Sequence, residues 1–333
     1  MKKLIISKNI KIAFFLILIF CLILLPLFAQ SFVLTIFARY MYFGLLTISF
    51  AFLAGQLGLF SLGVPVSFCI TAYTIAICQV KNIMPMVPSV FLGILIAMIF
   101  AALCGIMVNS TKDISFLMLT LVLSQLVWSL AAQWTSLTNS TTGLLGIKFP
   151  DSLNIFSSKP EINKYYWTVI VFFICVILIF IITQSSFGLK LKGIRESESR
   201  MILLGFNTKL LKWTAWMISS LISSISGILF IYYTGMITPD SMSLNASNQA
   251  MISSILGGVN SIVGGSILGT VINRTLEMTL SGLIKRYAIL VGSMFLLVVL
   301  AIPNGLTSIF SHIIKKKHSV SKNDSSEVKN KNE

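Results

Sequence analysis

Apolar runs about as long as a membrane crossing follow one another along this chain, and one long polar stretch interrupts them. The runs cover roughly residues 12–29, 33–54, 62–78, 88–108, 114–134, 165–183, 213–233, 248–280 and 288–302. A helix needs about 20 mostly apolar residues to cross a bilayer. Because lipid cannot form hydrogen bonds with backbone N–H and C=O groups, each run is expected to be helical. The pattern predicts an all-α, polytopic integral membrane protein with about eight to ten transmembrane helices, including broken or re-entrant segments.

Charge is scarce in this chain, and its sign indicates topology rather than a nucleic-acid partner. Only 11% of the residues are charged, against about 25% in soluble domains, and 56% are hydrophobic. The net charge of +15 comes from bases dispersed among loops and tails, with no basic stripe carrying interleaved aromatics. Lysine and arginine are therefore expected to mark the cytoplasmic side of the membrane.

The reactive side chains needed for an enzyme or a metal site are few. The only histidines, His312 and His318, lie in the C-terminal tail, and acids are nearly absent from the apolar runs. The cysteines all lie in apolar runs without a C-x-x-C pair, which favours buried thiols over metal ligands or disulfides. These cysteines are Cys21, Cys69, Cys78, Cys104 and Cys175. We expect no metal, no directly bound cofactor and no catalytic residue.

The two termini are predicted to be cytoplasmic. Residues 1–11 form a basic N-terminus, and the following apolar run can be interpreted as a cleaved signal peptide or as an uncleaved first helix. The run is longer than a usual signal core, so the uncleaved helix is preferred. Residues 12–306 then form the membrane domain, and 307–333 form a polar tail.

The polar stretch 187–212 carries six basic and two acidic residues and cannot lie in lipid. Apolar Ile194, Ile202 and Leu203 alternate with charged residues, as in a short amphipathic helix lying along a membrane surface or against a partner. Gly205, followed by Asn207, is typical of a helix stop and turn.

Two glycine-rich segments interrupt the apolar runs. The segment 55–74 contains three glycines, a proline and several hydroxyls, and predicts either a non-helical elbow in a translocation path or close helix packing. The segment 248–280 is best divided at its glycines into two short helices, because ten crossings then leave the basic tail inside. In this segment Arg274 and Glu277 are spaced to form an ion pair, which is preferred over a proton relay. The serine-rich run 213–233 is equally compatible with helix packing and with substrate contact.

Several motifs occur in an order that resembles the LivM-type permease subunit of branched-chain amino acid ABC importers. The motifs are Gly55…Gly58…Ser61-Leu-Gly63…Ala72-Tyr73, Thr142-Gly-Leu-Leu-Gly-Ile147, Phe187-Gly-Leu-Lys-Leu-Lys-Gly-Ile-Arg-Glu-Ser-Glu198, Leu204-Gly205, Thr238-Pro-Asp-Ser241, Gly257-Gly258-Val-Asn-Ser-Ile-Val-Gly264 and Pro303-Asn-Gly305-Leu306. Each is weak alone, and together they extend over most of the chain.

The resemblance implies an ABC importer permease fold and a set of partners. Two permease subunits, this one and a LivH-like partner or a second copy, would form the pore. Cytoplasmic ATPases would use ATP, and an extracytoplasmic binding protein would deliver a branched-chain or other hydrophobic amino acid. Alternating access would then move the solute. No phosphate-binding loop motif occurs in the chain itself.

The resemblance also assigns residues. Within a cytoplasmic coupling loop, 185–212, it places Arg195, Glu196, Glu198 and Gly205 at the ATPase. The translocation path is expected to involve the two glycine-rich segments, with the residues Gly55, Gly58, Ser61, Gly63, Tyr73, Gly257, Gly258 and Gly264. The chain departs from the family at Val64, Thr71 and Ser197, and the first two of these departures lie in the expected elbow.

Other classes of transporter remain open at this stage. A related ABC permease for sugars, nucleosides or urea is the alternative within the class. An ion-coupled secondary transporter would need ionisable groups inside the membrane, and only Glu277 and Arg39 qualify.

Overall fold

A computed structural model describes residues 30–108, 111, 113–147, 149 and 159–283, and in addition residues 22, 24–26, 289, 290, 292, 293, 296, 297, 300 and 305–307. Most of the predicted first span, most of the last span and nearly all of the tail lie outside these residues. The elements are α2 (Ser31–Leu57), α3 (Val64–Val80), α4 (Met86–Val108), α5 (Asp113–Gln133), α6 (Thr135–Thr138), η1 (Ser140–Thr142), β1 (Leu144–Leu145), α7 (Pro160–Gln184), α8 (Ser186–Glu196), α9 (Glu198–Leu203), α10 (Thr208–Thr234), β2 (Met236–Ile237), η3 (Pro239–Met242), α11 (Leu244–Gly257) and α12 (Ile262–Leu283).

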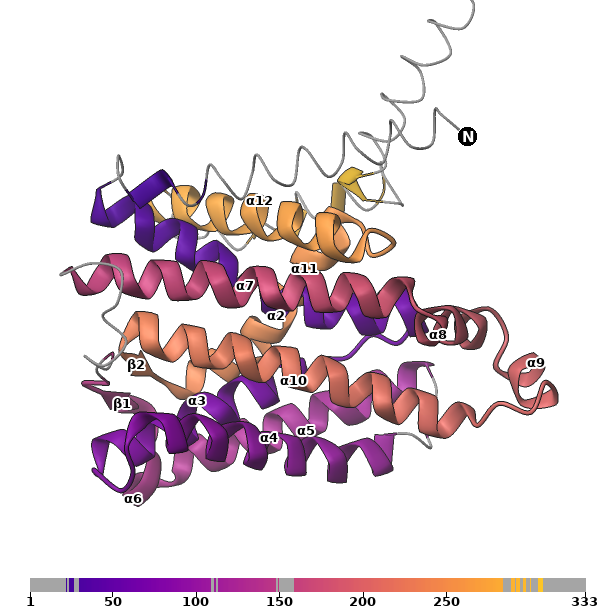
Figure 1. Cartoon of the computed structure of the whole chain (residues 1–333), viewed down its shortest axis with the longest axis horizontal. Coiled ribbons are helices and arrows are strands. Elements are labelled where there is room, and N and C mark those ends of the chain that lie inside the picture. The colour runs from indigo at the N-terminus through magenta and orange to yellow at the C-terminus, as the bar shows by residue number, and fades with distance from the viewer. Residues whose placement is uncertain are drawn as a thin grey trace, which may run out of the picture.

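The fold is a bundle of long apolar helices, which confirms the predicted all-α membrane architecture (Figure 1). In the described part of the chain, five helices are long and apolar enough to cross a membrane, namely α2, α4, α5, α7 and α10. The bent pair α11 and α12 raises this number to six if it forms a single span. Helix α3, with 17 residues, is shorter than a full crossing.

Helices α2 and α10 lie at the centre, and α4 and α5 lie at the periphery. In the most apolar 18-residue stretch of α2, 72% of the residues are buried inside the molecule, whereas in the corresponding stretches of α4 and α5 only 28% are buried. The outer helices expose large apolar side chains such as Phe91 and Val122. In a membrane this exposure is favourable, because lipid tails are as apolar as the side chains that meet them.

The serines of α10 hold the central helices together. Ser219 donates a hydrogen bond to the carbonyl oxygen of Ser49 on α2 (2.8 Å), and Ser226 donates to that of Tyr42 on the same helix. Ser223 donates to the carbonyl oxygen of Val64, at the start of α3 (2.6 Å). Interhelical hydrogen bonds and small residues are the usual means of helix packing in lipid. Of the two interpretations of this serine-rich run, the structure therefore supports packing.

The predicted elbow is present and is buried in protein. Helix α2 ends at Gly58, whose φ is 73°, and the chain becomes helical again only at Val64. Between them Leu62 donates its backbone N–H to Thr120 Oγ1 on α5 (3.2 Å) and accepts a hydrogen bond from Ser247 Oγ on α11 (3.0 Å). Side chains of neighbouring helices thus pair the freed backbone groups, as irregular backbone at membrane depth requires.

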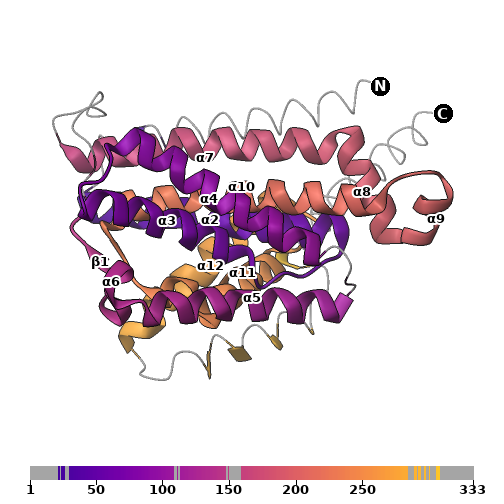
Figure 2. The same cartoon turned by 90° about the horizontal axis from the view of Figure 1, so that it is seen from below.

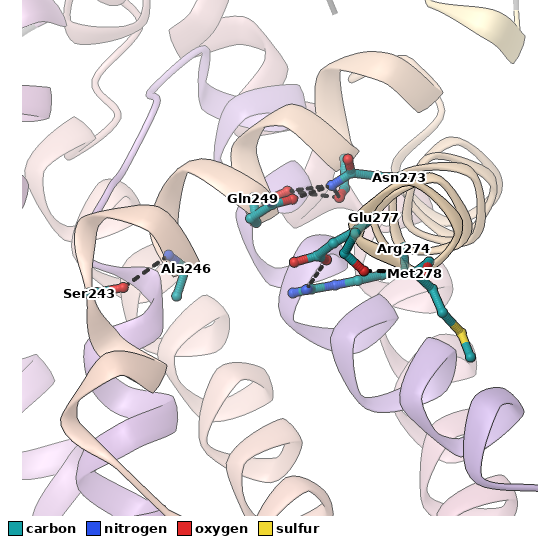
Figure 3. Close-up of polar contacts among 9 residues, drawn as sticks. Ser243, Ala246, Gln249, Asn273, Arg274, Glu277 and Met278 are labelled. Atoms are coloured by element: carbon teal, nitrogen blue, oxygen red, sulfur yellow. Dashed lines mark hydrogen bonds and ion pairs between the residues drawn. The ribbon is translucent and has the colours of Figure 1, made fainter. Parts of the chain in front are cut away.

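The second predicted break is also present, between α11 and α12, which bend by 116°. The helices approach so closely that a β-carbon at Gly257 would overlap the carbonyl oxygen of Gly265. Asn273 braces the pair by donating to Gln249 Oε1 (2.7 Å) and Ser253 Oγ (2.9 Å) (Figure 3). The sequence predicted two short helices here. Helix α11 is short, with 14 residues, but α12 has 22 residues and is longer than predicted.

Arg274 and Glu277 form an ion pair on α12, with 2.6 Å between Nη1 and Oε2 (Figure 3). The Arg274 guanidinium also lies over the Phe43 ring, 3.6 Å from its centroid. This arrangement fits a structural pair with a cation–π contact and agrees with the preferred interpretation of Glu277.

The molecule has two unlike ends. Helices α8 and α9 project from one end, and α6, β1 and β2 lie at the other (Figures 1 and 2). At the second end Leu144 and Leu145 pair antiparallel with Ile237 and Met236, which joins the motif after α5 to the end of α10. The α8–α9 end carries the six basic residues of the polar stretch 187–212, the charge pattern from which the sequence predicts a cytoplasmic side.

Candidate functional site

The predicted amphipathic helix is in fact two helices joined at Ser197. Helix α8 buries Gly188, Leu191 and Ile194 and packs on α2, α7 and α10. Helix α9 then begins at Glu198, and Ser197 caps it by accepting the backbone N–H of Arg200 (3.4 Å). The sequence pattern missed the break because both halves have apolar residues at helical spacing.

Gly205 ends α9 as predicted from the sequence. Its φ is 82°, and its N–H donates to the carbonyl of Ile202 (2.9 Å), while Phe206 donates to Met201 (3.1 Å). These two bonds form a Schellman motif, in which glycine adopts the left-handed conformation without a steric penalty. Asn207 caps the next helix, α10, by accepting the N–H of Leu210 (3.1 Å). Gly205 therefore shapes the loop.

Several large apolar side chains of the α8–α9 projection and the start of α10 are exposed. Leu203 is 86% exposed and Leu204 is 71% exposed. The surface, called here the tip surface, comprises Leu189, Ile202, Leu203, Leu204, Phe206 and Leu210. Exposed apolar side chains on a segment too polar to cross lipid mark a surface for a partner protein or for the membrane interface. Of these residues, Ile202 and Leu203 belong to the amphipathic pattern of the sequence, and none was predicted as a site.

The charged residues assigned to the coupling loop have different surroundings. Glu196 is exposed, whereas Glu198 forms an ion pair with Lys212 of α10 (2.7 Å), whose side chains are 23% and 10% exposed. Glu198 therefore ties α9 to α10. Arg195 extends toward the bundle and makes contacts described below.

The Glu198–Lys212 pair gives a testable expectation. Glu198→Lys should lower the apparent melting temperature, because two lysines then face each other, and the charge-swapped Glu198→Lys/Lys212→Glu protein should recover most of the loss. A double-mutant cycle should give a coupling energy of about 1 kcal/mol, at the upper end for exposed pairs, because both side chains are mostly buried. If the swapped protein is no more stable than the single variants, the ion pair does not hold α9 on α10.

Arg195 joins the coupling loop to both breaks of the bundle. Its Nη1 donates to the carbonyl oxygen of Gly55 on α2 (2.7 Å) and to Asn260 Oδ1 in the α11–α12 break (3.4 Å). A β-carbon at Gly58 would lie 3.2 Å from Arg195 Cγ, and one at Gly55 would lie 2.6 Å from the carbonyl oxygen of Val259. The glycines thus allow three separate segments to meet, and we call this meeting point the junction.

The segment after the last predicted span reaches the same place. A β-carbon at Gly305 would overlap the backbone of Gly258, and Thr307 donates its hydroxyl to the carbonyl oxygen of Gly257 (2.9 Å). Of the predicted path residues, Gly55, Gly58, Gly257 and Gly258 therefore gather at the junction. Segments more than 200 residues apart in the sequence contribute to it.

The remaining path residues lie elsewhere. Ser61 and Gly63 are in the elbow, where Ser61 Oγ accepts the N–H of Gly63 (3.2 Å). Tyr73 lies further along α3, and its hydroxyl is buried without a hydrogen-bond partner. Gly264 is exposed on α12 and is not in contact with the junction residues named above.

The elbow is closed in this conformation. The cavity beside it is lined by Gly63, Ser67, Thr120 and Trp216 and has a volume of about 10 Å³. This volume holds about one water molecule, far less than an amino acid. A space large enough for an amino acid would form here only if the surrounding helices moved.

Among the described residues, no group of three or more His, Cys, Asp or Glu side chains could hold a metal ion. The cysteines in the described part, Cys69, Cys78, Cys104 and Cys175, are buried free thiols.

Comparisons with known proteins agree with this geometry. Residues 32–302 match the family model described as "Branched-chain amino acid transport system / permease component". The chain is also similar to the "High-affinity branched-chain amino acid transport system permease protein LivH" of Salmonella typhimurium (strain LT2) and of Escherichia coli (strain K12). Each alignment is 25% identical over 156 residues and covers 46% of this chain and 50% of the relative. The chain therefore spans about half the length of the curated relatives it matches. No solved structure matches it.

Proposed function

The chain belongs to the family of permease components of branched-chain amino acid transport systems, and from this premise we propose that it is the membrane-spanning subunit of an ATP-driven importer for branched-chain or other hydrophobic amino acids. A permease component is a membrane transport subunit and not an enzyme. The protein is accordingly a multi-pass protein of the bacterial inner or cytoplasmic membrane.

One observation carries the coupling part of the proposal. The basic, cytoplasmic end bears an exposed apolar surface on two short helices, and the same helices contact both breaks of the bundle through Arg195. A cytoplasmic protein that binds the tip surface can therefore transmit movement to the elbow. We propose that this protein is an ABC ATPase, which binds and hydrolyses the ATP.

The proposal includes two further partners. A second permease subunit, LivH-like or a second copy, would complete the pore, because α4 and α5 are the least buried of the long apolar helices and offer apolar surface to a neighbour. An extracytoplasmic binding protein would deliver the solute to the end that carries β1 and β2. The order of the sequence motifs favours the LivM type for this chain, whereas the matched relatives named above are LivH proteins. The LivM assignment therefore remains part of the proposal.

ATP-dependent uptake of labelled leucine tests the proposal. The complete transporter, with its own ATPases and binding protein, is reconstituted in proteoliposomes with ATP inside. We expect uptake that excess isoleucine or valine inhibits, and that disappears when ATP is replaced by a non-hydrolysable analogue. The control is the same complex without the binding protein.

Two outcomes would contradict the proposal. Uptake driven by a proton or sodium gradient without ATP would identify a secondary transporter. Inhibition by a sugar, a nucleoside or urea, and not by isoleucine or valine, would keep the ABC class and reject the amino-acid substrate.

A further inference from the structure

Arg195 lies at the last turn of α8, and its guanidinium leaves that helix to contact α2 and the α11–α12 break. The acceptor on α2, the carbonyl of Gly55, is among the last four carbonyls of the helix, which have no partner inside the helix. The next carbonyl toward the N-terminus, that of Ala54, is already capped by the N–H of Gly58 (3.1 Å). Arg195 therefore pairs a backbone group that would otherwise lack a partner.

The electrostatics of this position favour a cation. The C-terminal end of a helix carries a partial negative charge, and a guanidinium there is stabilised by the dipole and by a charge-assisted hydrogen bond. Asn260 Oδ1 offers a second, longer contact at 3.4 Å. The first contact is strong and the second weak, so Arg195 is held firmly on α2 and loosely on the break.

We propose that Arg195 is a latch, a positioning residue that keeps the elbow closed until the ATPases move α8 and α9. This inference rests on the proposed function, since it assigns a role within the same transport cycle. When α8 shifts, the guanidinium leaves the carbonyl of Gly55. The C-terminal turn of α2 and the adjoining elbow are then free to open. The residue that the sequence placed at the ATPase thus acts on the bundle side of the coupling helices.

The latch predicts that its loss opens the elbow even without ATP. Ser61 is buried in the elbow, with 1% exposure, and Ser61→Cys gives a thiol that reports opening. In the full complex without nucleotide, Arg195→Gln should raise the labelling rate of this thiol, measured with a small thiol reagent, by about tenfold or more. That factor corresponds to the loss of one hydrogen bond to a charged group. The same complex without Ser61→Cys measures the background from the native cysteines.

Lys192→Gln is the matched control, because Lys192 is an exposed cation on the same helix. It removes one positive charge from α8 and should leave the labelling rate unchanged. In transport assays, Arg195→Gln should also increase the number of ATP molecules hydrolysed per amino acid imported, whereas Lys192→Gln should not.

A variant that strengthens the latch separates this role from simple destabilisation. Asn260→Asp places a carboxylate beside the guanidinium, and we expect slower labelling of Ser61→Cys and slower transport. In the Asn260→Asp/Arg195→Gln double variant, the protection should disappear. A destabilised bundle would show faster labelling in both single variants.

The inference is overturned if Arg195→Gln and Lys192→Gln give equal labelling rates and equal ATP-to-solute ratios. It is also overturned if Asn260→Asp opens the elbow. Uptake of leucine by the wild-type complex distinguishes a failure of this inference from a failure of the proposed function. If the importer assignment is wrong, the wild-type complex does not take up leucine; if only the latch is wrong, it does.

Discussion

Replacing Leu203 and Leu204 together by glutamate should abolish binding of the ATPase subunits and, with it, ATP-dependent uptake. Both side chains project into water at the tip of α9, with exposures of 86% and 71%, so the change removes no contact inside this chain. A leucine buried in a partner contributes about 1.5–3 kcal/mol, and two would contribute about 3–6 kcal/mol. The affinity for the partner should therefore fall by about a hundredfold or more.

Co-purification of the ATPases and the uptake rate are the measurements for this variant. The matched control, Leu203→Met/Leu204→Met, keeps apolar volume at both positions and should retain binding and uptake, since volume-conserving swaps are tolerated. The melting temperature of the isolated permease should be the same in both proteins. Full ATPase binding by the diglutamate variant would show that the partner uses another surface.

Local signals in the sequence were enough to predict the fold class and both breaks. The length of the apolar runs fixed α2, α4, α5, α7 and α10 as crossings, because a helix is the only way to pair the backbone of one segment in lipid. The glycine-rich segments predicted the elbow and the α11–α12 break for a related reason. Without a β-carbon, the backbone can turn and two backbones can approach.

The sequence could not reveal where the side chains of the coupling loop point. Arg195 is exposed, as its polar neighbours predict, yet its guanidinium also pairs with the carbonyl of Gly55, 140 residues earlier, which no local pattern indicates. Ile202 and Leu203 belong to the apolar face of the predicted amphipathic helix, yet both are exposed, Leu203 at 86%. In both cases the contacts and the exposure of the side chain depend on how α8 and α9 pack against the end of the bundle.

The same limit applies to the glycines, since composition alone does not distinguish a packing glycine from an exposed one. Gly264 and Gly265 are neighbours on α12. A β-carbon at Gly265 would lie 2.5 Å from the carbonyl oxygen of Gly258, whereas one at Gly264 would meet only Ser261 Oγ, at 3.3 Å. Only one of the two therefore fixes the distance between α11 and α12.

This difference leads to the second prediction with a large expected effect. Gly265→Ala should separate α11 from α12, because a methyl group cannot fit against the backbone of Gly258 and neither backbone can move without breaking the bend. Overpacking of this kind costs about 1–3 kcal/mol and more where the obstacle is backbone. We expect a large loss of folded protein in detergent extracts and a lower apparent melting temperature.

Gly264→Ala is the control for Gly265→Ala, because it adds the same methyl group at the neighbouring position without meeting the backbone of Gly258. Both substitutions replace glycine by alanine inside the same helix, so both gain about 1 kcal/mol of helix propensity. Only the first also meets the backbone of α11. Gly264→Ala should therefore be as stable as the wild type or slightly more stable. Equal stability of the two variants would mean that α11 and α12 are not held together by backbone contact at Gly265, and that the junction is looser than the closed elbow implies.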